Sequence, residues 1–167
     1  EERVKNGAYD IVYFNPYHYT VFSKAPGYRA FAREKERKLV GIIVVAKDSP
    51  LREIGDLKGK AVVFPAPAAF AASILPRAEF ERQNIAIEAR YVNSHDSVYR
   101  SVAQGSFAAG GGIKRTLEAI DPAIASRLRI LTSTPAYVPH AFAAHPRVDK
   151  ATLDKVSAAL FSLHGDE

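Results

Sequence analysis

The chain has 167 residues, of which 47% are apolar and 25% are charged, so it can bury a hydrophobic core and lies outside the range of disordered proteins. It contains no cysteine, which excludes disulfides, thiol nucleophiles and thiolate metal sites. The net charge of +5 favours anionic partners, but the basic residues are scattered, and this argues against nucleic acid.

The first predicted element is the end of a helix that stops at Gly7, because glycine often follows the last helical turn. Residues 9–14 are rich in aromatic and β-branched side chains and predict a strand. Tyr17 comes just after it, where an aromatic ring either packs in the core or lines a ligand cleft. Residues 21–38 predict a helix interrupted near Pro26.

Residues 39–46 form the most apolar run of the chain, which is too short for a useful helix and predicts a central strand. Residues 61–64 predict a second buried strand. Pro65 and Pro67 then end that strand, because proline lacks an N–H and fixes φ.

The chain becomes helix-compatible from Ala69, and the regular helix is expected to begin near Pro76. The first N–H groups of a helix have no partner inside it, and at the carboxyl end of a strand they attract an anion. An ordinary β-α connection is the alternative interpretation.

Residues 85–92 predict a strand, followed by a helix that Ser94 caps and that stops at Gly105. Asp96 in the first turn suits the helix dipole. Capping has no use for the imidazole of His95, which is therefore either incidental or a donor to a ligand.

The remaining predicted elements are a glycine-rich strand or turn over residues 107–112, a helix over 113–125, strands over 128–131 and 141–144, and a last helix that Asp149 caps and Gly165 closes. The three glycines 110–112 could cradle a phosphate, but alone they are a weak signal. Strands that alternate with helices at this spacing predict an α/β fold with mostly parallel sheets. No catalytic motif is present, so neither an enzyme nor a cofactor is predicted.

Six motifs occur in order: G-x-x-D-I-x-Y-F-x-P-Y-x-Y (residues 7–19), V-V-A-K-D-S-P (44–50), D-L-K-G-K (56–60), F-x-x-P (64–67), S-H-D (94–96) and V-A-x-G (102–105). Together they resemble the phosphonate/phosphite/phosphate family of periplasmic substrate-binding proteins, which serve ABC transporters. The resemblance covers most of the chain.

The resemblance implies a type II periplasmic-binding-protein fold, in which two α/β lobes joined by crossing strands close on a ligand between them. Residues 1–40 would belong to lobe 1, residues 41–131 to lobe 2 with its crossing strands, and residues 132–167 to the return to lobe 1. Family members extend beyond both ends of this chain. The resemblance therefore implies a fragment with an incomplete first lobe, from a periplasmic or otherwise extracytoplasmic protein whose signal peptide lies outside it.

In phosphonate binders, Ser and Thr hydroxyls after F-x-x-P hold the phosphonate oxygens together with backbone N–H groups. The matching positions here are Ala69, Phe70 and Ala71, so only the amides remain. Each lost hydroxyl contact to a charged group is worth about 1.5–3 kcal/mol. Ala108 replaces an acidic residue of the family pattern. Further on, Arg115 and the region of Pro139 and His140 stand where amine-bearing phosphonates find carboxylates, so the resemblance implies that a cationic amine is poorly received.

The ligand-binding residues that the resemblance implies are Tyr13, Asn15, Tyr17, Ala69, Phe70, Ala71, Ser94, His95, Arg115 and His140. Among them His95, Arg115 and His140 would attract an anion, and Phe70 and Tyr17 would favour an organic part.

Three functions stay open from the sequence. The first is a solute-binding domain that delivers a small anion, phosphate-like, phosphonate-like or organic, to an ABC transporter permease. The second is the sensor domain of a membrane signalling kinase, and the third is an enzyme on the same fold. The lost hydroxyls also leave open a site without a remaining role.

Overall fold

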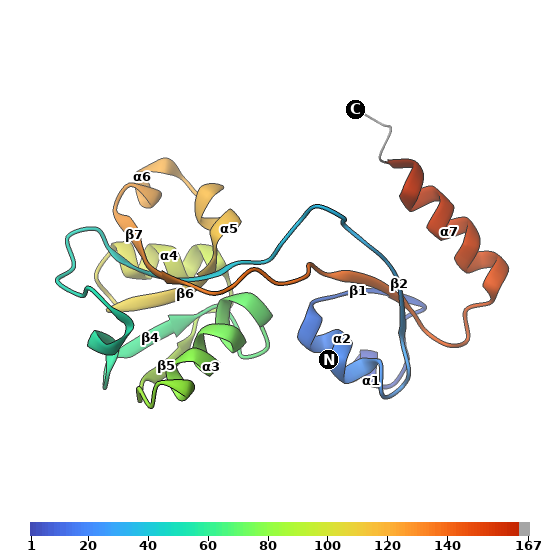
Figure 1. Cartoon of the computed structure of the whole chain (residues 1–167), viewed down its shortest axis with the longest axis horizontal. Helices are drawn as coiled ribbons and strands as arrows, with labels where there is room; N and C mark the ends of the chain where they lie inside the picture. Colours follow the sequence, from blue (N-terminus) through green and yellow to red (C-terminus); the bar gives the residue numbers. More distant parts are fainter. Residues whose placement is uncertain (164–167) are drawn as a thin grey trace. The chain divides into compact units, whose positions relative to one another are not determined.

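The computed structural model describes residues 1–163 and divides into two compact units (Figure 1). Unit 1 comprises Glu1–Arg37 and Val138–Glu167, and unit 2 comprises Lys38–Tyr137. Within residues 1–163, no helix is long and apolar enough to cross a membrane.

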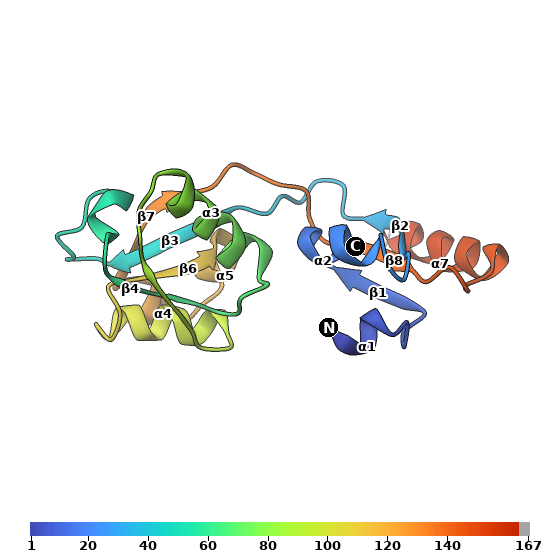
Figure 2. The ribbon, with the colours of Figure 1, turned by 90° about the horizontal axis from the view of Figure 1, so that it is seen from below.

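Unit 2 is built around a five-stranded sheet in the order β5-β4-β6-β3-β7, of which Figure 2 labels β4, β6, β3 and β7. Its elements are β3 (Gly41–Ala46), η1 (Ile54–Leu57), β4 (Ala61–Phe64), η2 (Phe70–Ile74), α3 (Leu75–Arg82), β5 (Glu88–Tyr91), α4 (His95–Ala103), β6 (Ala109–Ile113), α5 (Lys114–Glu118), α6 (Pro122–Ala125) and β7 (Leu128–Ser133). Strand β4 is parallel to β5 and β6, whereas β3 is antiparallel to β6 and β7.

Helices cover both faces of this sheet, with α4 on one face and α3 on the other (Figure 1). Strand β3 serves both cores because its side chains alternate. Ile42 and Val44 pack in the hydrophobic cluster on the α4 face of the sheet, and Ile43 and Val45 pack in the cluster on the α3 face. All four are at most 1% exposed, which explains why the sequence of β3 is uniformly apolar.

The glycine run 110–112 lies in β6 and lets both layers approach the sheet closely. A Cβ on Gly112 would lie 2.1 Å from the Tyr99 hydroxyl of α4, and a Cβ on Gly111 would lie 2.1 Å from the Ala72 carbonyl oxygen of η2. These glycines therefore serve packing, and the idea that they cradle a phosphate is wrong.

Unit 1 contains a smaller sheet in the order β1-β8-β2, in which both pairings are antiparallel. Its elements are α1 (Glu2–Lys5), β1 (Ile11–Phe14), α2 (Pro16–Phe22), β2 (Arg29–Arg33), β8 (Ala141–Ala144) and α7 (Lys150–Ser162). The core consists of Phe14, Phe22, Tyr28 and Ala143. The α/β class is confirmed, although parallel pairing is confined to β5-β4-β6.

Two predicted helices are wrong. The predicted helix over 21–38 is absent, because α2 ends at Phe22 with its C-cap at Ser23 and Arg29–Arg33 forms β2, for which β8 offers a partner strand. The helix over 113–125 is divided, because Pro122 starts a new helix that Asp121 caps by accepting from the Ala123 N–H at 2.8 Å. The predicted stop at Gly165 lies outside the described residues.

Candidate functional site

The sheet of unit 2 brings several predicted site residues to one edge. Strands β5, β4 and β6 run parallel, so the segments that follow them meet at their carboxyl ends. The segment after β4 carries Ala69, Phe70 and Ala71, the segment after β5 carries His95, and the segment after β6 carries Arg115. These residues are separated in the sequence by up to two strands, yet they lie at the same edge of the sheet.

The helix after β4 opens with a π-helical turn. The N–H groups of Ser73 and Ile74 both donate to the Ala69 carbonyl, at 2.8 and 3.1 Å. The N–H groups of Phe70, Ala71 and Ala72 precede them and have no acceptor within the helix. Since η2 continues into α3 without a break, these N–H groups lie at the positive end of a helix that extends to the end of α3.

Two features explain this irregular start. Pro76 cannot donate to the carbonyl four residues before it, and a wider turn relieves the clash of its ring with that carbonyl. Gly41 and Gly111 then let the turn lie against the sheet, since a Cβ on Gly41 would lie only 2.0 Å from the Ala71 carbonyl oxygen. The expected regular helix near Pro76 is confirmed, because α3 begins at Leu75.

His95 is the first residue of α4 and is half-buried. Its neighbour Ser94 caps the helix, accepting from the Ser97 N–H at 3.0 Å, as predicted. Burial lowers the pKa of His95, so the imidazole is neutral at pH 7. Its Nδ1 is buried without a hydrogen-bond partner in residues 1–163, so an entering ligand can supply one.

Positive charge is available near this edge. Arg115 is exposed on α5 and makes no ion pair within residues 1–163. Ala108 does not belong to this edge, because it precedes β6 and lies at its amino end. A side chain at position 108 therefore stands at the opposite end of the strand from this edge.

Sequence reasoning missed Tyr137, whose ring meets that of Phe70 edge-on, with centroids 5.6 Å apart and an interplanar angle of 89°. Leu39 and Tyr137 exchange two backbone hydrogen bonds of 2.9 Å, which fix the segment after β7. Tyr137 lies in a proline-containing loop without periodicity, so no local pattern marks it.

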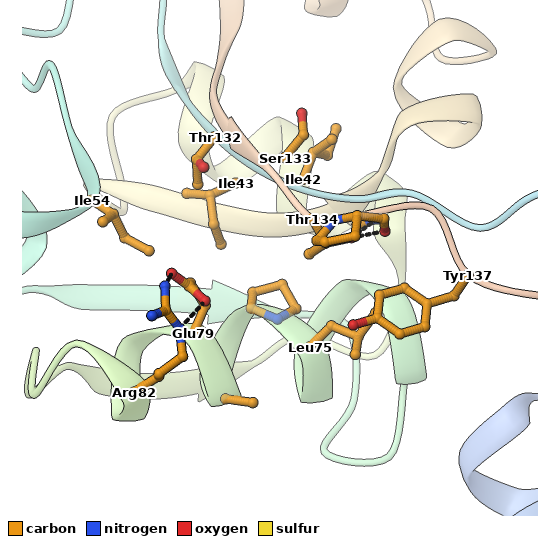
Figure 3. A pocket seen from close by; sticks show the side chains of 14 residues that line it. Ile42, Ile43, Ile54, Leu75, Glu79, Arg82, Thr132, Ser133, Thr134 and Tyr137 are labelled. Carbon is orange, nitrogen blue, oxygen red and sulfur yellow. Dashed lines mark hydrogen bonds and ion pairs between the residues drawn. The ribbon is translucent and has the colours of Figure 1, made fainter.

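Tyr137 also closes one end of a groove of about 440 Å³ between α3 and the strands β3 and β7 (Figure 3). Ile43 and Ile54 point into it, and Leu75 lies beside Tyr137. An ion pair between Glu79 and Arg82 stands at the other end, with 3.0 Å between Arg82 Nε and Glu79 Oε2. The hydrogen bonds from Arg82 and Gln83 lower the pKa of Glu79 to about 2.

Unit 1 carries an aromatic cluster of its own. Tyr13, which is 46% exposed, stacks on His140 with ring centroids 5.1 Å apart and contacts the ring of Phe142 at 4.6 Å. Burial lowers the pKa of His140, which Glu34 only partly offsets. Phe142 was missed, although its spacing of two from His140 places both side chains on one face of an extended segment.

The other predicted residues of unit 1 lie on α2. Asn15 caps this helix, its side chain accepting from the His18 N–H at 2.8 Å, so it has a structural role. Tyr17 is exposed, and its ring lies 5.6 Å from that of His18. Within residues 1–163, no group of three His, Asp or Glu side chains could hold a metal ion.

The whole chain, residues 1–167, matches the family described as ABC transporter, phosphonate, periplasmic substrate-binding protein. The chain belongs to this family. No curated protein matches it.

Solved structures share the fold of this chain. XAC2383 from Xanthomonas citri bound to chloride superimposes with a TM-score of 0.83 at 16% identity, over 94% of this chain and 64% of that one. The ATP-bound form of XAC2383 gives 0.80 at 15%, over 94% and 65%. PhnD1 from Prochlorococcus marinus in complex with methylphosphonate gives 0.75 at 21%, over 87% and 60%. The chain thus spans less than two thirds of these proteins, and the likeness confirms the periplasmic-binding-protein fold.

Proposed function

We propose that this family member captures a small anion outside the cytoplasm and delivers it to an ABC transporter. The observation that carries the proposal is the set of N–H groups of Phe70, Ala71 and Ala72 at the start of a helix, which donate to no backbone acceptor within residues 1–163 and lie at the carboxyl edge of the unit 2 sheet. Such groups favour a negatively charged ligand.

Two side chains complement these amides. The unpartnered Nδ1 of half-buried His95 offers a hydrogen bond, and the unpaired Arg115 raises the local positive potential. The ligands of the similar proteins, chloride, ATP and methylphosphonate, are all anions, which supports the same class here. Phosphate-like, phosphonate-like and organic anions are the candidates.

We further propose that unit 1 contributes to ligand binding through Tyr13, Tyr17 and His140. The stacked Tyr13 and His140 rings are held by a strand and its neighbour, so they meet a ligand with little loss of side-chain freedom. Asn15 contributes by fixing the start of α2, and its amide is engaged in that cap.

A thermal-shift screen of the full-length protein tests the proposal, with phosphate, phosphite, sulfate, alkylphosphonates, carboxylates and nucleotides as probes. A ligand at 100 times its Kd adds about 2.7 kcal/mol, which moves the midpoint by several degrees. We expect a shift with one anion class and its loss in His95→Ala. A flat response to every probe would contradict a role in anion capture.

The comparisons support a transport role and lend no support to a signalling-kinase partner. Membership of a transport-binding family likewise favours release of an unchanged ligand over turnover. Recovery of the probe unaltered after long incubation with the protein is the matching expectation.

A further inference from the structure

The proposed anion site of unit 2 has an unusually apolar surround. At Ala69, Phe70 and Ala71 the side chains offer no hydroxyl, so at these three positions an anion can be contacted only by backbone N–H groups. An oxygen of an inorganic anion that faces these three apolar side chains would gain no hydrogen bond from them, which is costly. An anion that turns an organic substituent toward these side chains avoids that cost.

The aromatic pair at this site indicates what the substituent is. Phe70 is half-buried and Tyr137 is 38% exposed, so a face of the pair remains available for a third ring. The edge-on packing at 5.6 Å holds both rings in place before a ligand arrives. Aromatic rings add offset or edge-on partners with a gain beyond that of buried area alone.

Space for such a ring adjoins the pair. The N–H of Leu75 bonds to the Phe70 carbonyl, so Leu75 lies one turn further along the same helix. Leu75 and Tyr137 line the near end of the groove between α3 and β3, whose floor there includes buried Pro76 (Figure 3). A substituent that passes Phe70 therefore enters an apolar space.

Resting on the proposed function, we infer that the ligand is an aryl or heteroaryl phosphonate or phosphate. Its anionic group lies on the N–H groups of Phe70 to Ala72, and its ring packs against Phe70 and Tyr137 at the mouth of the groove. The rings of Phe70 and Tyr137 thus take the place, as a source of affinity, of the hydroxyls that are absent at positions 69–71.

Isothermal titration of the full-length protein with a matched pair of probes tests this inference. Methylphosphonate and phenylphosphonate carry the same anionic group and differ in the ring. We expect phenylphosphonate to bind about tenfold more tightly. Phe70→Leu, which keeps an apolar side chain, should remove most of that preference and leave methylphosphonate affinity within about twofold. Phe161→Leu, an exposed ring on α7, is the control and should change neither value.

Tyr137→Leu provides a second variant should Phe70→Leu unfold, and thermal melting of each variant checks its fold. Phenyl phosphate and adenosine monophosphate distinguish the source of the ring, because tighter binding of the nucleotide indicates a heteroaryl ligand. Equal affinities for methyl- and phenylphosphonate, or equal losses for both in Phe70→Leu, would overturn the inference and leave anion capture standing. Binding of none of these anions would overturn the inference, and a flat response to the wider thermal-shift screen as well would overturn anion capture.

Discussion

The two units carry their proposed ligand-binding groups in different ways. Unit 2 offers backbone N–H groups at the start of a helix. Glycines in the sheet place these groups because they let the helix start pack closely, and a proline in the helix widens its first turn. Unit 1 offers side chains, the stacked rings of Tyr13 and His140 on a small antiparallel sheet. A backbone site depends on how closely layers pack, whereas a side-chain site can be altered one ring at a time. Substitutions of the closely packed glycines in unit 2 should therefore act mainly on stability, and substitutions of the exposed rings in unit 1 mainly on affinity.

The largest expected effect is that of Gly41→Ala in unit 2. The new Cβ would lie 2.0 Å from the Ala71 carbonyl oxygen, so the helix start must move off the sheet. We expect a loss of about 3 kcal/mol in the free energy of unfolding, measured with urea. Gly55→Ala is the matched control, since the nearest atom there is 3.5 Å away. Equal free energies of unfolding for the two variants would contradict the view that unit 2 depends on close packing of its layers.

Removing one buried hydroxyl from each unit compares their polar cores. The Tyr99 hydroxyl in unit 2 bonds to the Ile113 carbonyl at 3.0 Å and to the Thr116 hydroxyl at 2.7 Å. The Tyr28 hydroxyl in unit 1 donates to a single carbonyl, that of Tyr9, at 2.6 Å. We expect Tyr99→Phe to lower the free energy of unfolding by about 2 kcal/mol and Tyr28→Phe by about 1 kcal/mol. The reverse order in chemical denaturation would contradict this account.

Truncating the exposed ring of unit 1 should affect binding more than folding. Tyr13→Leu removes the ring stacked on His140 and keeps an apolar side chain on β1. We expect ligand affinity to fall about three- to tenfold, by titration with phenylphosphonate, and the melting temperature to change little. Tyr9→Leu, an exposed ring before β1, should leave affinity unchanged. Loss of stability without loss of affinity would assign Tyr13 to the core.

Acid should destabilise both units through one histidine each. Burial lowers the folded-state pKa of His95 and of His140 below the ordinary value of 6.5. As the pH falls through about 6.5, the unfolded chain therefore takes up protons before the folded chain does. The folded state keeps its full stability above that pH and loses stability below it. We expect melting temperatures to fall between pH 7.5 and 5.5, and less so in a His95→Gln, His140→Gln double variant. An unchanged slope in that variant would exclude these histidines as the cause.

The smallest expected difference concerns two helix caps. Ser94 caps α4 in unit 2, and Asp149 caps α7 in unit 1 by accepting from the Thr152 N–H at 2.9 Å. Alanine at either position should cost about 1 kcal/mol. Only Ser94→Ala should also weaken anion binding, because fraying of the first turn displaces His95. Equal affinity of the two variants would separate His95 from the ligand.

Sequence patterns predicted the buried strands and the irregular helix start well, because apolar runs and prolines act locally. Strand β2 was missed because Arg29–Arg33 becomes a strand through pairing with β8, more than 100 residues away. The Phe70 and Tyr137 contact was missed for the same reason, since long-range pairing of Leu39 with Tyr137 creates it. The resemblance named Tyr13 and His140, and the structure adds that their rings stack.

The most direct test of the account follows the backbone amides themselves. Titrating the ¹⁵N-labelled full-length protein with phenylphosphonate or methylphosphonate should shift the amide signals of Phe70, Ala71 and Ala72. Those signals should saturate with the affinity found by calorimetry, while amides buried within strand ladders, such as that of Val63, stay unchanged. Tight binding that leaves the three helix-start amides unmoved would contradict the claim that this backbone holds the anion.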